Sequence, residues 1–165
     1  MSPVLFELAD EAATTAFAAA LAHHLEPGLL ITLTGDLAAG KTTLVRAALR
    51  ALGHTGKVKS PTFTLVESYP LPGFIVHHFD LYRLSGASEV EEFGFADYLA
   101  PNAVCLVEWP ERGGEALPRI DLAVRMDITG AETRRLALSA ETMKGEHLLR
   151  QILAEPALVP LRCRI

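Results

Sequence analysis

The sequence predicts an α/β fold, in which helices cover both faces of a mostly parallel, mixed central sheet. Short apolar runs alternate with stretches of helical periodicity along the first two thirds of the chain, which is the element order of α/β proteins. The later apolar runs follow one another too closely for helical crossovers, so we expect part of the sheet to be antiparallel. The chain has 165 residues without a repeat or a linker, and a single domain over residues 1–165 is expected.

The first part of the chain contains a helix, a strand, a loop and a second helix, in that order. Residues 10–25 are rich in alanine, with larger apolar residues at four-residue steps, which predicts an amphipathic helix. Residues 29–34 are apolar and β-branched, as in a buried strand. Residues 35–40 form a glycine-bounded loop, and residues 41–52 have helical spacing that ends at Gly53.

The remaining elements are shorter, and a Ser-Pro-Thr segment interrupts the chain before them. Proline and glycine around residues 70–73 predict a turn. We expect strands at residues 63–66, 74–79 and 103–107, short helices at 88–93 and 95–99, an antiparallel sheet edge from 121–127 and 135–138, and a closing helix at 146–154.

Composition excludes several classes of protein. Half of the residues are hydrophobic, which rules out a disordered chain. The net charge is −5, from 20 acidic and 15 basic residues, which argues against a protein whose main role is to coat nucleic acid. Cys105 and Cys163 match no zinc or redox spacing and are expected to be ordinary thiols in a reducing compartment. Without a basic leader or an apolar run of about 20 residues, we expect a soluble, cytoplasmic protein with no membrane contact.

Residues 35–42 carry the strongest motif, because Gly-Asp-Leu-Ala-Ala-Gly-Lys-Thr fits the P-loop pattern G-x-x-x-x-G-K-[ST] in full. From average residue usage, a chain of this length meets the pattern by chance on the order of once in a few hundred sequences. A strand is predicted before the loop and a helix after it, which is the context that the motif requires. The motif therefore predicts a P-loop NTPase fold.

Each part of this loop has a physical reason to bind a nucleoside triphosphate. The glycines let the backbone curl so that its N–H groups face an anion, and the following helix adds the positive end of its dipole. Lys41 is placed to neutralise β- and γ-phosphate oxygens, and the Thr42 hydroxyl to bind Mg²⁺. The alternative, a glycine turn with an incidental lysine, explains none of this context.

Two acids follow buried strands. In an α/β sheet the carboxyl ends of parallel strands meet beside the loop, so Asp80 and Glu108 are candidates to bind Mg²⁺ or to orient water. Many buried strands end in a solvated acid, and that alternative stays open for both residues.

Other candidates carry weaker signals. The hydroxyls of Ser60 and Thr62 lie where nucleotide-sensing switch segments occur, although an ordinary proline turn would also use them. His77 and His78 face opposite sides of a strand and cannot chelate one ion together. Trp109 is a candidate partner anchor, and packing in the core or rim is the equal alternative.

With these residues considered, the chain closely resembles the TsaE family, also called YjeE. The resemblance covers about residues 5–140 and is carried by the loop 35–43, by the Ser-Pro-Thr segment in 58–66, by His-Phe-Asp-Leu-Tyr-Arg-Leu at 78–84, and by Leu-Val-Glu-Trp-Pro-Glu at 106–111. It implies a bacterial P-loop ATPase required for threonylcarbamoyladenosine modification of tRNA at position 37. It also implies that the chain acts on a complex of TsaB and TsaD, so direct contact with tRNA is not expected as the main interaction.

The resemblance implies a role for individual residues. Lys41 and the loop amides would hold phosphates, Thr42 and Glu108 would hold Mg²⁺, and Asp80 would be required for hydrolysis. Residues 60–64 would form a switch-like loop with hydroxyls at Ser60, Thr62 and Thr64. The full set expected near ATP is Glu11, Gly35, Asp36, Leu37, Ala38, Ala39, Gly40, Lys41, Thr42, Thr43, Asp80 and a late arginine, Arg134 or Arg135. Ala38, where relatives often carry glycine, is harmless unless its φ must be positive.

Two further functions are compatible with the motifs. A small-molecule kinase shares this size and loop, but such kinases carry an arginine-rich lid, and the only late pair here is Arg134 and Arg135. A nucleotide-dependent binding module that needs no hydrolysis is the other alternative. A GTPase is disfavoured because the Asn-Lys-x-Asp motif is absent.

Overall fold

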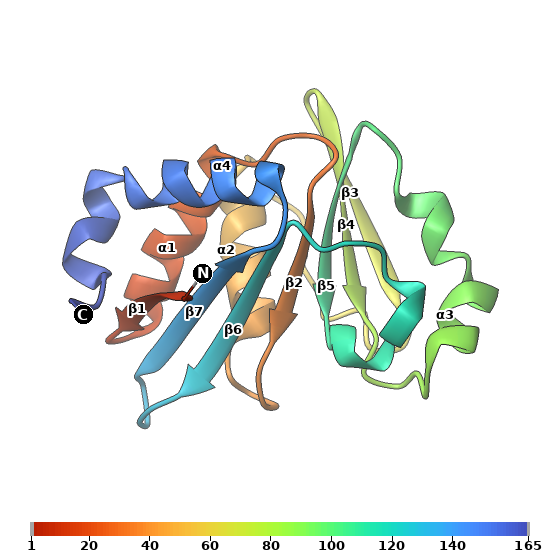
Figure 1. Cartoon of the computed structure of the whole chain (residues 1–165), viewed down its shortest axis with the longest axis horizontal. Helices are drawn as coiled ribbons and strands as arrows, with labels where there is room; N and C mark the ends of the chain where they lie inside the picture. The colour runs from red at the N-terminus through yellow and green to blue at the C-terminus, as the bar shows by residue number, and fades with distance from the viewer. Residues whose placement is uncertain (1, 165) are drawn as a thin grey trace.

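Residues 2–164, which the computed structural model describes, contain a seven-stranded mixed sheet in the order β1-β7-β6-β2-β5-β4-β3 (Figure 1). Strands β6, β2, β5 and β4 run parallel at its centre, and β3, β7 and β1 pair antiparallel at the two sides. The strands are β1 (Val4–Leu8), β2 (Leu30–Thr34), β3 (Val66–Leu71), β4 (Phe74–Asp80), β5 (Ala103–Glu108), β6 (Leu122–Ile128) and β7 (Arg134–Ala140). The mixed α/β fold predicted from the sequence is therefore confirmed.

Helices lie on both faces of the sheet, as expected, but they cover the faces unequally. The larger core joins the sheet to α1 (Glu11–His23), α2 (Lys41–Ala51) and α4 (Met143–Leu153). On the other face a smaller core packs under α3 (Ala87–Phe93) and under the 3-10 helix Phe95–Tyr98, beside β4 and β5 (Figure 1). Within residues 2–164, no helix has the length and apolar character that crossing a membrane requires.

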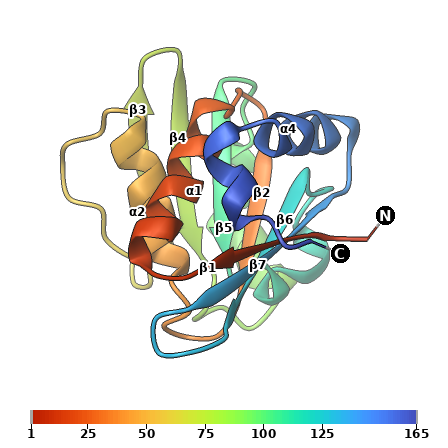
Figure 2. The ribbon, with the colours of Figure 1, turned by 90° about the vertical axis from the view of Figure 1, so that its left-hand side faces the viewer.

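The N-terminal strand β1 was not predicted, and it changes the edge of the sheet. It pairs antiparallel with β7, from Val4 opposite Leu138 to Leu8 opposite Arg134. The strands at 122–128 and 134–140 are antiparallel as predicted, but β1 rather than β7 forms the edge. Near its C-terminal end the chain returns to β1, where Phe6 and Arg162 form an isolated antiparallel β-bridge. Figure 2 shows both termini on this side of the molecule.

The strand predicted at residues 63–66 is wrong for residues 63–65, and only Val66 belongs to a strand. Residues 62–64 form a turn, and Leu65 follows in a bend with a φ of 68° that is incompatible with a strand. Strand β3 follows, and Pro70, which predicted a turn, lies inside it opposite Ile75. Proline is tolerated there because β3 is an edge strand. Figure 2 shows the segment between α2 and β3 looping outward beyond α2.

The closing helix α4 begins three residues before the predicted start at 146. Its N-cap is Thr142, whose hydroxyl accepts a hydrogen bond from the backbone N–H of Gly145 at 3.0 Å. The helix predicted at 10–25 is instead shorter at both ends, because Asp10 is the N-cap of α1 and His24 its C-cap.

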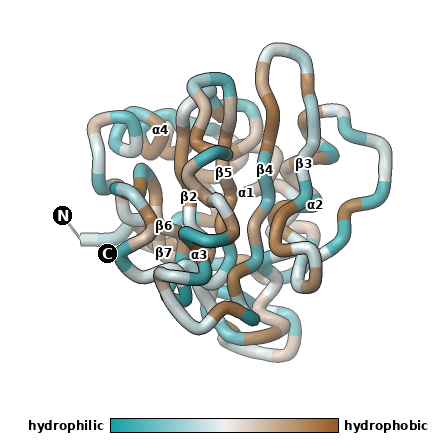
Figure 3. The backbone as a smooth tube through the Cα atoms, turned by 90° about the vertical axis from the view of Figure 1, so that its right-hand side faces the viewer, coloured by the Kyte–Doolittle hydropathy of each residue, from teal (hydrophilic) through white to brown (hydrophobic). Residues whose placement is uncertain are grey.

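The carboxyl ends of the central strands converge at one edge of the sheet. Asp80, at the end of β4, is the register partner of Glu108, at the end of β5, and Glu108 in turn lies opposite Leu33 in β2. The loop that follows β2 leaves from the same edge. Most of β4 is apolar, but its sequence Phe-Ile-Val-His-His-Phe-Asp contains a hydrophilic stretch, visible as teal between brown in Figure 3.

Candidate nucleotide-binding site

The loop between β2 and α2 has positive φ angles, which favour glycine, at three of its positions. Gly35 has a φ of 147°, and a Cβ atom there would lie 2.3 Å from the carbonyl oxygen of Met126 in β6. Gly40, the N-cap of α2, has a φ of 109°. Ala38 has a φ of 65°, so the condition under which alanine is unfavourable at this position is met.

The side chain of Lys41 is folded back over this loop. Its ammonium donates hydrogen bonds to the carbonyl oxygens of Gly35 at 2.5 Å and Asp36 at 3.0 Å, and it lies 4.5 Å from the ring centre of Trp109. Burial lowers the pKa of Lys41, and the nearby carboxylates of Glu108 and Asp80 oppose that shift. A cation is thus held at the loop by backbone carbonyls and an aromatic face.

Glu108 is buried beneath the start of α2, where it accepts two side-chain hydrogen bonds. The Thr42 hydroxyl lies 3.0 Å from Oε2 and 3.2 Å from Oε1 of Glu108. The Nε2 atom of His78 lies 2.6 Å from Oε2. The hydroxyl of Thr42 and the carboxylate of Glu108 therefore meet at the first turn of α2.

These two groups fit a magnesium ion. Mg²⁺ prefers hard oxygen ligands in octahedral geometry at about 2.0–2.1 Å, which places neighbouring ligands about 2.9 Å apart. Thr42 Oγ1 lies 3.0 Å from Oε2 and 3.2 Å from Oε1 of Glu108, so either carboxylate oxygen is close to that spacing.

Asp80 lies beside Glu108 and is held by the segment that precedes β3. Its Oδ2 atom is 3.1 Å from the Ser60 hydroxyl and 3.3 Å from the Thr62 hydroxyl, and its Oδ1 accepts the backbone N–H of Tyr82 at 3.0 Å. The two hydroxyls are 2.8 Å apart. The two hydroxyls and Asp80 Oδ2 thus form three close contacts, but the hydroxyls supply only two protons. At any moment one of the three contacts is therefore not a hydrogen bond.

Two pockets flank the loop. One, of about 480 Å³, is lined by the side chains just described together with Leu37, Tyr82 and Trp109. The second, of about 470 Å³, lies between the loop, the start of α1 and the hairpin of β6 and β7. Ala38, Gly40 and Thr43 line both pockets, which therefore adjoin each other across the loop.

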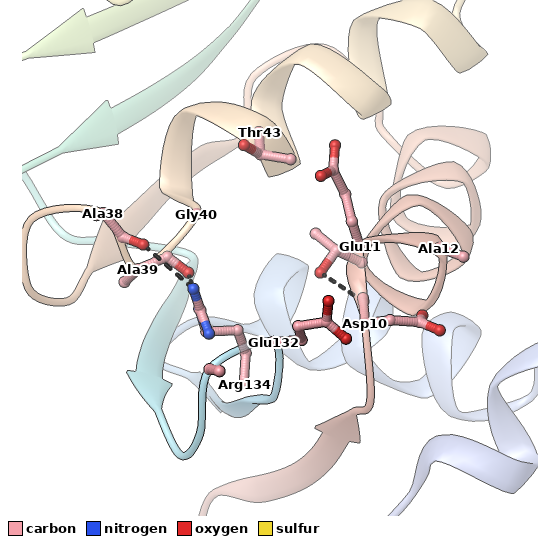
Figure 4. A pocket seen from close by; sticks show the side chains of 11 residues that line it. Asp10, Glu11, Ala12, Ala38, Ala39, Gly40, Thr43, Glu132 and Arg134 are labelled. Carbon is pink, nitrogen blue, oxygen red and sulfur yellow. Dashed lines mark hydrogen bonds between the residues drawn. The ribbon is translucent and has the colours of Figure 1, made fainter.

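Figure 4 shows the second pocket, with Arg134 on one side and Glu11 on the other. Arg134 donates from Nε to the carbonyl oxygen of Ala39 at 2.8 Å and from Nη2 to that of Ala38 at 3.4 Å. Arg135 points away and pairs with Glu7. Of the two late arginines left open by the sequence, the structure therefore places Arg134 at the loop.

Most of the candidate residues come together at this edge, and two observations differ from expectation. The Thr64 hydroxyl contacts Glu67 at 3.1 Å, so it lies apart from Ser60, Thr62 and Asp80. His78, which we had set aside because it cannot share an ion with His77, contacts Glu108 directly. Its two-residue spacing from Asp80 places both on one face of β4 and is the signal that sequence reasoning missed.

Together, the strand–loop–helix unit and the parallel strands beside it define a protein of the P-loop NTPase fold class. The family model "Threonylcarbamoyl adenosine biosynthesis protein TsaE" matches residues 8–136. The chain belongs to the TsaE family.

Named relatives agree with this assignment. The tRNA threonylcarbamoyladenosine biosynthesis protein TsaE of Haemophilus influenzae is 44% identical over 126 residues, 76% of this chain and 79% of that protein. The protein of the same name from Bacillus subtilis is 35% identical over 139 residues, 84% of this chain and 87% of that protein. The crystal structure of Bacillus subtilis YdiB superposes with a TM-score of 0.80 at 29% identity, covering 93% of this chain and 96% of that one.

Proposed function

We propose that this chain binds ATP with Mg²⁺, hydrolyses it in the cytoplasm, and thereby acts on the TsaB–TsaD complex during threonylcarbamoyladenosine formation in tRNA. The observation that carries the proposal is the meeting of Lys41, Thr42, Glu108 and Asp80 at one edge of the sheet. Family membership and the names of the relatives support the pathway.

Phosphate binding is assigned to the loop and to Lys41. The loop backbone offers its N–H groups, and α2 adds the positive end of its dipole. The Lys41 ammonium now contacts the carbonyl oxygens of Gly35 and Asp36. Exchange of these contacts for β- and γ-phosphate oxygens needs only a change in the lysine side chain, because its Cα is fixed in the first turn of α2.

The metal is assigned to Thr42 and Glu108, whose oxygens have the spacing described above. When bound, Mg²⁺ would neutralise charge that develops on the phosphate oxygens during hydrolysis. Protein ligands of this number are typical for Mg²⁺ sites completed by substrate phosphates and water.

Orientation of the attacking water is assigned to Asp80. A carboxylate offers about four acceptor positions, and Ser60, Thr62 and Tyr82 occupy at most three of them. The remaining position can accept a proton from water in line with the γ-phosphate. Because the two hydroxyls share protons, one of them is free to turn toward a phosphate oxygen while the other holds Asp80.

The second pocket is assigned to the nucleoside. It adjoins the loop and is bounded by polar side chains that suit a base and a ribose, with Glu11 across from Arg134 (Figure 4). Arg134 would act there by bracing the loop carbonyls of Ala38 and Ala39.

Large apolar side chains at the phosphate pocket and beside it support docking of a protein partner at its mouth. Leu37, Tyr82 and Trp109 line the pocket, and Phe63 follows Thr62, which also lines it. Leu37 is 62% exposed and Phe63 is 82% exposed. The guanidinium of Arg83 stacks on Phe63 at 4.6 Å, and Tyr82 packs on Trp109. Aromatic and arginine side chains of this kind are enriched in protein interfaces.

The proposal is tested by phosphate release from ATP, measured with and without the purified TsaB–TsaD complex. We expect slow release by the chain alone and a clear increase with the complex. A rate of phosphate release that is the same with and without the complex would contradict the assigned partner. Phosphate transferred to an added small acceptor instead of water would indicate a kinase.

A further inference from the structure

One buried side chain at the metal-binding edge has no part in the mechanism above. The imidazole of His78, on β4, has none of its surface exposed. Its Nε2 lies 2.6 Å from Glu108 Oε2, whereas its Nδ1 is buried without a hydrogen-bond partner among the described residues. Buried nitrogens of this kind are uncommon and call for an explanation.

The direction of the hydrogen bond follows from the acceptor. An ionised carboxylate can only accept, so Nε2 of His78 carries the proton and donates to Glu108. Oε2 of Glu108 then has two neighbouring donors, His78 and the Thr42 hydroxyl. Oε1 has, within the part of the chain that the structure describes, only the same Thr42 hydroxyl, at 3.2 Å. The two oxygens of one carboxylate are therefore unequally occupied.

The unpaired Nδ1 indicates which interaction the imidazole serves. A leucine or phenylalanine would fill the same buried volume without leaving a nitrogen unpaired. Among residues 2–164, the hydrogen bond from Nε2 to Glu108 is the only polar contact that distinguishes histidine from leucine or phenylalanine at this position. The presence of an imidazole at this place is thus explained by Glu108.

We propose that His78 is a positioning residue that makes Glu108 a one-oxygen ligand and thereby favours Mg²⁺ over Ca²⁺. By holding Oε2, His78 leaves Oε1 as the oxygen open to a cation. Mg²⁺ suits single-oxygen carboxylate ligands in its small octahedron, whereas Ca²⁺ readily takes both oxygens of a carboxylate. This inference rests on the proposed function, because it concerns the same Mg²⁺–nucleotide site.

The test uses nucleotide binding rather than hydrolysis. Affinity for ADP and for the non-hydrolysable analogue AMP-PNP is measured by calorimetry in EDTA, in Mg²⁺ and in Ca²⁺, for the wild type and for His78→Leu, His78→Phe and His78→Gln. His77→Leu is the matched control. It removes a mostly buried imidazole from the same strand, but on the opposite face and bonded to Ser68 at 2.7 Å. Thermal unfolding of each variant reports its folding.

We expect His78→Leu and His78→Phe to bind nucleotide in EDTA as the wild type does. The Mg²⁺ concentration that gives half of the Mg²⁺-dependent change in nucleotide affinity should rise about 10-fold or more, which is the usual effect of mutating a residue that orients a metal ligand. The preference for Mg²⁺ over Ca²⁺ should fall. His78→Gln should recover much of the Mg²⁺ response and of the preference for Mg²⁺, because its amide Nε2 can donate to Glu108 from a similar position. His77→Leu should leave both unchanged.

Three outcomes would overturn the inference: an unchanged Mg²⁺ response in both non-donating variants, an equal loss of binding in EDTA, or the same loss in His77→Leu. If only one non-donating variant folds, its comparison with His78→Gln decides. If the wild type binds no nucleotide, the proposed function fails together with the inference. If the wild type binds nucleotide and the two non-donating variants keep its Mg²⁺ response, only the inference about His78 is refuted.

Discussion

Replacement of Gly35 by alanine tests how closely the loop is packed on the sheet. A Cβ atom at this position would lie 2.3 Å from the carbonyl oxygen of Met126, and the φ of 147° already disfavours it. Gly53 provides the matched control. It follows α2 with a φ of 94°, and an added Cβ would meet nothing within 4 Å. The two alanine variants therefore share the backbone strain and differ in the collision.

The expected loss of stability is estimated from the backbone strain and from the collision. Positive φ at a residue with a Cβ costs about 1–2 kcal/mol, which is the expected destabilisation for Gly53→Ala. Overpacking adds about 1–3 kcal/mol, so Gly35→Ala should lose about 2–5 kcal/mol. For a chain of this length each kcal/mol lowers Tm by about 2–4 °C, which gives about 2–8 °C for the control and about 4–20 °C for Gly35→Ala.

Thermal unfolding by circular dichroism measures both changes, and titration with ADP measures the site. We expect Gly35→Ala to lose nucleotide affinity, because relief of the collision must shift the loop amides. Gly53→Ala should bind as the wild type does. Equal Tm values for the two variants, or undiminished ADP binding by Gly35→Ala, would refute the reasoning about loop packing.

Three further predictions concern strain, pH and thiol reactivity. Ala38→Gly should stabilise the fold by about 0.5–1 kcal/mol in urea unfolding, because relief of the positive φ exceeds the entropic cost of glycine; a loss would contradict the strain at Ala38. Burial lowers the pKa of His77, so its contribution to stability is present above pH about 6.5 and declines as the pH falls below that value. Urea unfolding at pH 7.5 and 5.5 should show a smaller decline for His77→Gln, and an identical decline would refute the assignment. Burial raises the pKa of Cys105 to about 12, so a thiol reagent at pH 8 should modify only Cys163 in the folded chain and both thiols in urea. Modification of both thiols before unfolding would contradict the burial of Cys105.

The fold and the centre of the site could be predicted because their signals are local. The P-loop pattern needs only eight consecutive residues, and the strand and helix beside it have clear periodicity. Asp80 and Glu108 could be paired in advance because parallel strands present their carboxyl ends at one edge. Nothing in these inferences depended on contacts between distant segments.

The predictions from the sequence failed where contacts between residues far apart in the chain determine the structure. Strand β1 exists because β7 offers it an edge, a partner more than 120 residues away. The turn and bend at 62–65 contain apolar residues that favour a strand locally, yet Ser60 and Thr62 hold the segment on Asp80. The spacing of His78 from Asp80 places both on one face of β4, but the proposed contact with Glu108 also requires the register of β4 against β5, which a single sequence does not contain.

The Asp80→Asn variant tests the central claim, that the edge of the sheet is arranged for ATP hydrolysis, most directly. This substitution keeps the shape of the side chain and most of its hydrogen bonds. Phosphate release at saturating ATP is measured with the TsaB–TsaD complex present, and ADP affinity is measured in parallel. The proposed mechanism predicts a rate about 10²–10⁴-fold below the wild type with ADP affinity retained. A wild-type rate in Asp80→Asn would contradict it.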